Sequence, residues 1–465
     1  MSMNDEKQEG KEIEKGEALS RVLGPMHIWA LGVGIVLVGE FMGWNFTIAK
    51  GGSIGSLAAL WLIAILYIMI IMMNIEMGSV MPEAGGQYAM AKYILGPLAA
   101  FNVGLMLVFE YAMLEAADAL VVGQILHAVN PEINSLPYII LSLLALTYLN
   151  YRGVYATLTL NFVITLIAFA TIIVLVVSTG LAGEGSIAGG LSKMTDGLPY
   201  GFIGIAAAMQ FGVWFFLGIE GSTLAAEECR STSRALPTGA IAGLATLMIG
   251  ATITWLVCSY LVPAKELGAS AYPLFDAALK TGKSVLIVMM FVGTMLACLA
   301  SANGCINDAS RAWFAMSRDD LIPSFFAKTH PKYNTPYRAI VFLLPISLAF
   351  AFTGMLDQVV TFSIFSALLV YVLTAIMMIR FRIMYPLGTI DRGYVAPGHP
   401  VPAIVALILL AFALFGMYLG YWVNMLGGIT FYLLASLWFV KRREKFVDKE
   451  KFLKAGASRW PKPHI

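Results

Sequence analysis

Long apolar runs recur along almost the whole chain, and they constrain the fold more than any other feature of the sequence. Two examples are residues 56–73 and residues 344–352. Of the 465 residues, 59% are hydrophobic and 12% are charged, whereas a soluble protein carries roughly a quarter charged residues. Transmembrane helices need long apolar blocks, and transmembrane barrels need short alternating segments instead. The pattern therefore predicts an all-α membrane protein with many spans.

Twelve segments are expected to span the membrane, and nothing between them is long enough for a soluble domain. They centre near 26–48, 54–78, 99–128, 137–150, 155–181, 200–227, 238–262, 285–315, 338–354, 358–380, 401–420 and 423–440. A net charge of +2 gives no large basic field for nucleic acid, and the four cysteines and five histidines show no spacing typical of a disulfide framework or a zinc site. We expect no cofactor and no metal.

The distribution of basic residues predicts the orientation. With a cytoplasmic N-terminus, 25 of the 30 lysines and arginines fall on the cytoplasmic side. The exterior loops keep only Lys50, Lys193, Lys265, Lys280 and Lys283. The excess of positive charge inside predicts that both termini are cytoplasmic, in a plasma (inner) membrane.

Two spans combine many glycines with one acid. The first holds Gly32, Gly34, Gly39, Gly43 and Glu40, and the sixth holds Gly212, Gly218, Gly221 and Glu220. Glycine weakens a helix, and in lipid every freed backbone group needs a partner. Two such segments, five spans apart, are typical of a transporter with a five-plus-five inverted repeat and discontinuous helices 1 and 6. The alternative is that these glycines only let helices pack closely.

Four motifs resemble those of the amino acid–polyamine–organocation superfamily of permeases. They are PEAGGQY (82–88), NYRGV (150–154), FFLGIEGSTLAAEE (215–228) and SRAWFAMSRDDLIP (310–323). The resemblance covers nearly the whole chain. It implies a cytoplasmic tail (1–21), a first repeat of helices 1–5 (22–195), a second repeat of helices 6–10 (196–382), helices 11–12 (383–440) and a second cytoplasmic tail (441–465).

Within that superfamily, the first and sixth spans look most like the ethanolamine permease group. Most amino acid permeases have a G-S-G triplet in the first span, whose amides hold the carboxylate of the substrate. Here the triplet falls on Leu37, Val38 and Gly39, and Glu40 follows directly. A carboxylate at that place would repel a substrate carboxylate and favour an amine. The candidate substrate contacts in this span are Val36, Val38, Gly39 and Glu40.

The third span carries three acids, Glu110, Glu115 and Asp118. They lie within a helical fan of roughly 140° and can face the bundle interior together. Acids inside a membrane are costly and are functional candidates by default. Glu110 is the preferred substrate contact. A tilted span would instead leave Glu115 and Asp118 near the exterior surface.

The sixth span supplies further candidates. Trp214, Phe216 and Gly218 match the segment that contacts the substrate in the family, and a tryptophan face can hold an ammonium group. Their alternative role is core packing. Glu220 matches a glutamate that the resemblance links to pH-dependent transport, so it is the candidate for ion coupling. Its alternative role is a hydrogen bond to a neighbouring helix end.

The coupling ion stays open between proton and sodium, with the proton preferred. Some proton-coupled relatives have a lysine in the fifth span, where this chain has Ala168. Ser301 and Asn303 in the eighth span offer oxygen atoms for sodium. Asp308 and Arg311, three residues apart, are expected to form an ordinary ion pair.

The sequence thus predicts a secondary active transporter that imports a small amine, ethanolamine first, by alternating access. An amino acid or polyamine symporter or exchanger of the same fold is the alternative. A membrane-embedded enzyme for lipid headgroups should carry clustered aspartates or histidines for a metal, and the sequence has no such array. A substrate-sensing receptor with the permease fold is a further, less favoured class.

Overall fold

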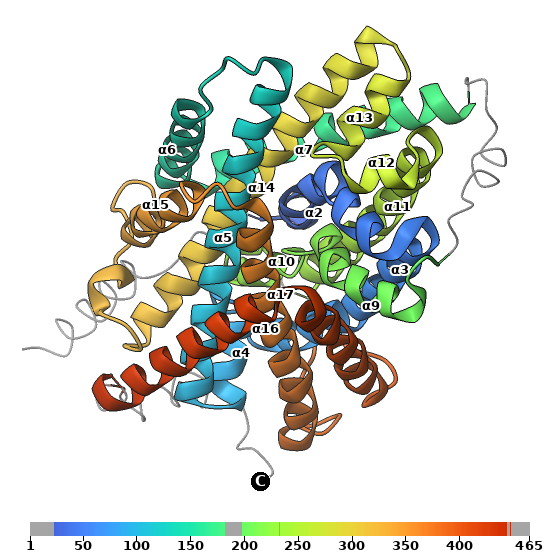
Figure 1. Cartoon of the computed structure of the whole chain (residues 1–465). Coiled ribbons are helices and arrows are strands. Elements are labelled where there is room, and N and C mark those ends of the chain that lie inside the picture. The colour runs from blue at the N-terminus through green and yellow to red at the C-terminus, as the bar shows by residue number, and fades with distance from the viewer. Residues whose placement is uncertain (1–22, 182–197, 232, 444–446, 448–465) are drawn as a thin grey trace, which may run out of the picture.

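The structure is a computed structural model, and it describes residues 23–181, 198–231, 233–443 and 447. These residues form a bundle of helices without a β-sheet (Figure 1). The predicted tail 1–21 lies outside the described residues, as does most of the predicted tail 441–465.

The helices follow one another with short connections. In chain order, the long ones are α2 (Pro25–Met42), α3 (Trp44–Val80), α5 (Pro97–Val129), α6 (Leu136–Arg152), α7 (Val154–Val176), α11 (Ala235–Leu261), α14 (Ser284–Arg318), α15 (Tyr337–Ala351), α16 (Leu356–Met384) and α17 (Val401–Arg442). The shorter ones are α4 (Gln87–Ile94), η1 (Val177–Leu181), α9 (Gly201–Gly212), η2 (Val213–Phe215), α10 (Gly221–Leu224), η3 (Ala226–Glu228), α12 (Ala264–Gly268), α13 (Pro273–Lys280) and η4 (Ser324–Ala327).

Seven of the described helices are long and apolar enough to cross a membrane. These are α2, α3, α11, α14, α16, α17 and the part of α7 and η1 from Thr157 to Thr179. The prediction of an integral, all-helical membrane protein is confirmed at this level. The count of twelve spans and the inverted repeat stay predictions.

Two of the long helices each cover parts of two predicted spans. α3 contains the end of the first and the whole of the second, and its backbone turns at Gly52, where φ is +68°. α17 covers the two last predicted spans, and its backbone leaves the helical region at Tyr421. A positive φ is accessible to glycine without steric cost, which explains the residue at the first turn.

The first predicted span, 26–48, is divided at Gly43, where α2 ends and before α3 begins. α2 stays α-helical through Leu37, Val38 and Gly39, and the only irregular residue before α3 is Gly43. Close packing explains the glycines instead. A Cβ on Gly39 would lie 2.5 Å from the carbonyl oxygen of Trp214, and one on Gly34 would lie 2.6 Å from Asn161 Nδ2. In this span the close-packing alternative therefore accounts for the glycines.

The interruption expected in the sixth span is present. α9 ends at Gly212, the 3₁₀ turn η2 follows, and a non-helical stretch leads to the short helix α10. Gly218 has a φ of +100°, and a Cβ there would lie 2.2 Å from Ile35 Cγ2 of α2. The chain can take this course only with glycine at residue 218.

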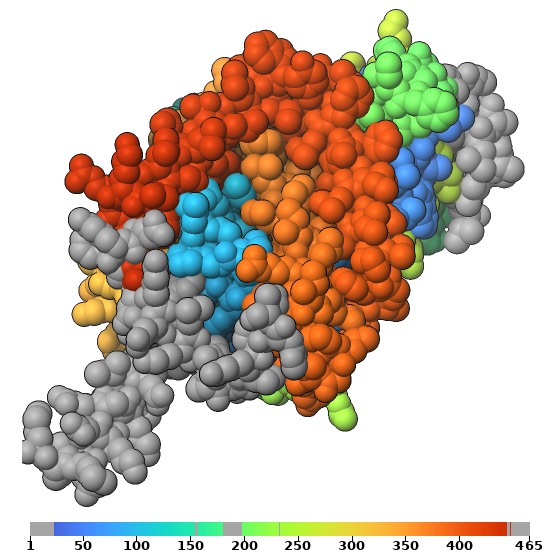
Figure 2. Space-filling view, turned by 90° about the horizontal axis from the view of Figure 1, so that it is seen from below, coloured from blue at the N-terminus to red at the C-terminus, as the bar shows by residue number. Residues whose placement is uncertain are grey.

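α2 lies at the centre of the bundle, in contact with α7, α11 and α14 (Figure 1). α5 packs along α14 and α16, and α3 packs along α9. Viewed from below, α17 and α16 cover much of one face, with the blue start of the α4–α5 region between them (Figure 2). The interrupted segment after α9, from Val213 to Glu220, is buried.

Candidate substrate and ion site

The interruption of the sixth span carries the most informative side chain of the site. Glu220 ends the non-helical stretch, immediately before α10, and is fully buried. The turn around it is closed by backbone hydrogen bonds, from Gly221 N to Gly218 O at 2.9 Å and from Thr223 N to Glu220 O at 2.8 Å. The backbone is thus satisfied locally, and the carboxyl group is free to face neighbouring helices.

Glu220 meets Glu110 of α5. The two carboxyl groups lie within hydrogen-bonding reach of each other, and both side chains have no exposed surface. An ionised carboxylate can only accept hydrogen bonds, so a contact between two carboxyl groups requires a proton on one of them. Two carboxyl groups at this separation can share one proton and leave one negative charge.

Three tyrosines surround this pair. Tyr371 of α16 donates a hydrogen bond of 2.5 Å to Glu220 Oε1, and its hydroxyl lies 3.0 Å from that of Tyr67 of α3. Tyr111 of α5 contacts the backbone at Gly218, where an added Cβ would lie 3.6 Å from its Cε1 atom. The tyrosines supply both hydroxyl groups and ring faces at the same place.

A third acid lies close by. Asp308 of α14 lies near enough to Glu110 for their charges to repel, as do those of Glu110 and Glu220. Asp308 packs so tightly on the interruption that a Cβ at Gly221 would lie 1.8 Å from its Oδ2 atom. The expected ion pair of Asp308 with Arg311 is replaced by another, since Arg311 Nε lies 2.7 Å from Glu228 Oε1.

An aromatic layer covers the interruption on the predicted exterior side. Trp44 stacks on Phe215 with centroids 4.1 Å apart, and Phe46 stacks on Phe211 at 4.7 Å. Trp214 lies 6.1 Å from the ring of Phe46 and is fully buried. The structure therefore has Trp214 in this layer, together with residues of the first span.

Glu40 lies apart from the acid pair. It is buried against α11, where Thr254 donates a hydrogen bond of 2.9 Å to its Oε2 atom. The same hydroxyl accepts a hydrogen bond of 3.2 Å from Trp44 Nε1. The hydrogen-bond partner of Glu40 is on α11, whereas the carboxyl groups of Glu110 and Glu220 face each other. The structure thus brings Glu110, Gly218 and Glu220 together and leaves Glu40 in a different contact.

Of the other candidate residues, one lies beside Glu110 and Glu220, and the rest lie elsewhere along α2. Phe216 packs against Tyr67 with centroids 5.3 Å apart and so belongs to the surroundings of the acid pair. Val36 and Val38 are buried in the hydrophobic core of α2. Gly39 faces the backbone of Trp214.

The remaining ion-site candidates lie on other helix contacts. Glu115 accepts a hydrogen bond of 2.7 Å from Ser347 of α15, and Asp118 faces Ser301 of α14. Neither acid has exposed surface, and whether they lie near the exterior side of the membrane stays a prediction. Asn303 bonds to Asn150 at 2.8 Å and is thus engaged away from the acid pair.

Sequence reasoning missed the tyrosines of the site. Tyr67, Tyr111 and Tyr371 stand in apolar runs, where an aromatic residue is the usual choice for packing. The available signal was the hydroxyl group, because a buried hydroxyl needs a hydrogen-bond partner. Which partner it finds depends on helix neighbours that spacing along the chain does not reveal.

The predicted cytoplasmic side is closed by a set of ties. Leu23 N donates to Glu228 O at 2.9 Å, and Arg230 N donates to Leu23 O at 2.9 Å. Arg318 forms two hydrogen bonds with Glu227, at 2.9 and 3.1 Å. Burial raises the pKa of the nearby Cys229 thiol to about 12. These contacts join the start of α2, the end of the sixth span and the end of α14.

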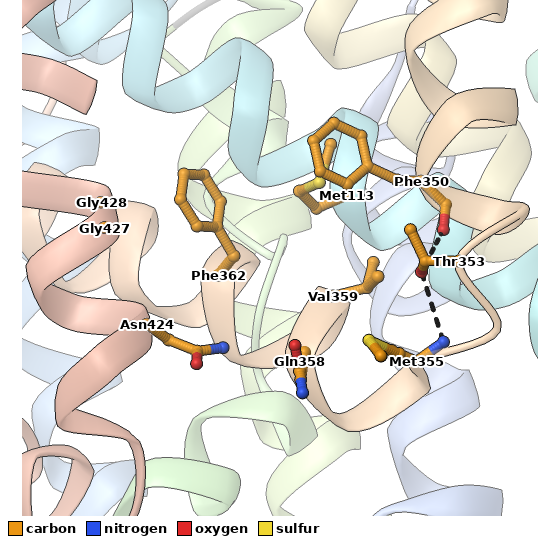
Figure 3. Close-up of a pocket in the computed structure, with 10 residues that line it drawn as sticks. All are labelled: Met113, Phe350, Thr353, Met355, Gln358, Val359, Phe362, Asn424, Gly427 and Gly428. Carbon is orange, nitrogen blue, oxygen red and sulfur yellow. Dashed lines mark hydrogen bonds between the residues drawn. The ribbon is translucent and has the colours of Figure 1, made fainter. Parts of the chain in front are cut away.

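Several cavities lie outside the acid pair, and two of them border helices that carry site residues. One, of about 340 Å³, is bounded by Met42, Asn45, Phe46, Gln124 and Asp357 among others, and the ring of Phe46 lies 6.1 Å from that of Trp214. The other, of about 240 Å³, lies between α5, the connection from α15 to α16, and α17 (Figure 3). It is lined by Met113, Phe350, Thr353, Met355, Gln358, Val359, Phe362, Asn424, Gly427 and Gly428. This second lining has no charged group.

Comparisons with known proteins agree with this architecture. The sequence model of the amino acid permease family matches residues 27–442. An uncharacterized transporter of Rhizobium meliloti is 54% identical over 453 residues, which are 96% of each chain. A branched-chain amino acid permease of Bacillus subtilis is 23% identical, over 90% of this chain and 94% of its own. A methylthioribose transporter of the same species is 26% identical, over 70% of this chain and 73% of its own.

Proposed function

Because this chain belongs to the amino acid permease family of membrane transporters, we propose that it imports a small organic amine, with ethanolamine as the first candidate, by alternating access. It is a transporter and not an enzyme. The observation that carries the proposal is the buried contact between Glu110 and Glu220 at the interruption of the sixth span.

The charge of the site favours a cation. Among the described residues, no ion pair joins Glu110 or Glu220 to a lysine or arginine, and the nearby Asp308 is a further acid. A buried negative charge without a partner is unfavourable, and an ammonium group would neutralise it. The ring faces of Tyr67 and Tyr111 would add a favourable interaction of about 0.5–2 kcal/mol. A substrate carboxylate would meet repulsion at the same place.

The same pair would couple uptake to a proton. Two touching carboxyl groups hold one proton between them and leave one negative charge. The proton and the ammonium group can therefore be bound at the same time, as symport requires. Tyr371 would stabilise the charged carboxylate through its 2.5 Å hydrogen bond to Glu220. Sodium coupling, exchange and facilitated uptake are the competing modes.

Access would alternate between the two sides of the interruption. From the predicted exterior, the cavity next to Phe46 would admit the amine after Phe46 and Trp214 separate. Release toward the predicted cytoplasm would require the ties of Leu23 and Glu228 to open. We propose a plasma (inner) membrane location with both termini cytoplasmic, because the basic residues are concentrated on one side.

An amino acid is the second candidate substrate. The Bacillus subtilis relative is named a branched-chain amino acid permease, which favours it. The acid pair would then serve the coupling proton, and the substrate carboxylate would be bound elsewhere. A polyamine would fit the acidic site but would need a longer cavity.

The deciding experiment is uptake of labelled ethanolamine into vesicles that contain the purified protein, with and without an inward proton gradient. Unlabelled alanine, arginine and putrescine serve as competitors. Glu110→Gln and Glu220→Gln test the pair, and Glu132→Gln, at an exposed loop residue, is the matched control. We expect accumulation that requires the gradient, resists alanine and disappears only in the first two variants. Uptake of alanine without uptake of ethanolamine would overturn the amine assignment.

A further inference from the structure

The cavity beside Phe46, on the predicted exterior side, has a carboxylate in its wall. This cavity of about 340 Å³ lies between the junction of α2 and α3, the end of α5, the connection from α12 to α13 and the start of α16. Its polar lining residues are Asn45, Gln124, Ser270 and Asp357. Among the described residues that line it, Asp357 alone is charged. The cavity wall therefore carries one negative charge and no positive one.

The carboxylate of Asp357 is not engaged by the protein. Among the residues that the structure describes, it takes part in no ion pair and no hydrogen bond. An acid in the first turn of a helix is favourable in itself, but this side chain bonds to none of the free N–H groups at the start of α16. Gln358, the next residue, lines the uncharged cavity of Figure 3 instead. The carboxylate is thus available to a ligand in the cavity.

The rest of the polar wall is held by hydrogen bonds. Asn45 Nδ2 donates to Ser270 O at 2.6 Å, and Ser270 Oγ donates to Asp276 Oδ2 at 2.6 Å. Tyr272 Oη donates to the backbone oxygen of Gln124 at 2.9 Å. These bonds fix the connection from α12 to α13 against α3 and α5. They do not use the side-chain amide of Gln124, which stays available together with Asp357.

One cation lies near Asp357 outside the cavity lining. Lys50 of α3 is close enough for its charge to attract that of Asp357, but the two side chains form no ion pair. Lys50 Nζ lies over the rings of Phe211 and Tyr421, 5.8 and 5.2 Å from their centroids. Aromatic faces therefore hold this ammonium group, and the carboxylate is left for a second cation.

We propose that Asp357 binds the ammonium group of the substrate in this cavity, as a first site on the way to Glu110 and Glu220. This inference rests on the proposed transport of an amine. A carboxylate pairs with an ammonium group through strong, charge-assisted hydrogen bonds. The carboxylate of an amino acid would be repelled at the same place, so the cavity would favour amines before the buried pair is reached.

The other groups of the cavity fit a small amino alcohol. Phe46 offers an aromatic ring to the cation, and the side-chain amide of Gln124 can bond to a hydroxyl group. The ring of Phe46 also lies 6.1 Å from that of Trp214, so the cavity adjoins the aromatic layer above the interruption. An amine held by Asp357 would be positioned to enter when these rings separate.

The first test is the kinetics of ethanolamine uptake by the full-length protein in vesicles. Asp357→Asn removes the charge with little change in shape, and Asp357→Glu keeps the charge. Glu132→Gln, at an exposed loop residue on the same predicted side, is the matched control. We expect Asp357→Asn to raise KM at least threefold, with a smaller change in maximal rate because the buried pair is intact. Asp357→Glu should restore most of the apparent affinity, and Glu132→Gln should not change it.

The second test needs no transport. All four cysteines of the chain are buried, so Ala271→Cys places one accessible thiol in the cavity wall. Its labelling rates with a trimethylammonium methanethiosulfonate and with a sulfonate one report the local charge. We expect the ratio of the cationic to the anionic rate to fall at least threefold when Asp357→Asn is added. Ethanolamine should slow the labelling of Ala271→Cys, and sodium chloride at equal ionic strength should not.

An unchanged KM or an unchanged ratio of labelling rates in Asp357→Asn would overturn the inference. An equal rise of KM in Glu132→Gln would overturn it too, since the effect would then belong to the surface charge in general. Uptake of ethanolamine without any protection of Ala271→Cys would contradict this site and leave the proposed function intact, even if Asp357→Asn failed to fold. Protection by ethanolamine without its uptake would contradict the proposed substrate and support the ammonium site.

Discussion

Two segments of this molecule have closely similar compositions and different structures. The segment around Glu40 and the segment around Glu220 each combine an apolar run, several glycines and one acid. In the first, Glu40 lies within the helix α2, and its carboxyl group bonds to Thr254 of α11. The second is interrupted, and its acid meets Glu110 and Tyr371.

The difference lies in what the glycines contact. In α2 a Cβ at Gly39 would collide with the backbone of Trp214, so glycine there allows one helix to approach another. In the sixth span Gly218 has a φ of +100°, so glycine there allows the chain to leave the helix. Glycine allows close helix packing in the first segment and a left-handed backbone conformation that interrupts the helix in the second. An acid becomes part of a shared site only in the second.

The largest expected effect is on transport in Glu220→Gln. Glutamine keeps an oxygen that can accept from Tyr371, but it carries no negative charge and takes up no proton beside Glu110, and a hydrogen bond to a charged group is worth about 1.5–3 kcal/mol. We expect initial amine uptake to fall by at least about 100-fold, since 1.4 kcal/mol corresponds to a factor of ten. The measurement is the initial rate in vesicles, normalised to the amount of folded protein. A rate within threefold of the unaltered protein would show that the two segments do not differ in function.

Gly218→Ala should chiefly affect stability. The left-handed backbone costs about 1–2 kcal/mol for a residue with a Cβ, and overpacking against Ile35 adds about 1–3 kcal/mol. We expect a clear fall in melting temperature, measured by intrinsic fluorescence in detergent. Gly32→Ala in α2 is the matched control, because its Cβ would lie 3.2 Å from the flexible side chain of Ile219. Equal falls in melting temperature in Gly218→Ala and Gly32→Ala would contradict the distinction between the left-handed backbone at Gly218 and close packing at Gly32.

Tyr371→Phe should have a moderate effect. It removes the hydroxyl that bonds to Glu220 and leaves the ring in place. A hydrogen bond to a charged group contributes about 1.5–3 kcal/mol, so uptake should fall by about ten- to 100-fold. Tyr432→Phe is the matched control, since it also loses a buried hydroxyl contact, with Ser366 at 2.6 Å. A similar loss of uptake in the control would assign the effect to general destabilisation.

Much of the fold could be predicted because its signals are local in the sequence. Long apolar runs indicate helices, and the glycines with an acid indicated the interruption of the sixth span. The course of α2 could not be predicted, because whether a glycine allows packing or unwinding depends on a neighbour such as Trp214, far along the chain. The different partners of Glu40 and Glu110 could not be predicted either. Each is a buried acid on a helix, and its partner depends on which helix lies beside it, α11 for Glu40 and the sixth span for Glu110.

Glu40→Gln should have the smallest effect of the four. The amide oxygen of glutamine can still accept the hydrogen bond from Thr254, and the change removes a carboxyl group that touches no other acid. We therefore expect amine uptake and its dependence on the proton gradient to stay within about threefold of the unaltered protein, which is less than 1 kcal/mol. Thr254→Val is the companion variant, because it leaves both Glu40 and Trp44 without their partner and should lower stability by about 1–3 kcal/mol. If Glu40→Gln abolished uptake while the protein stayed folded, the charge that selects the amine would lie in the first span, and the pair of Glu110 and Glu220 would serve the proton alone.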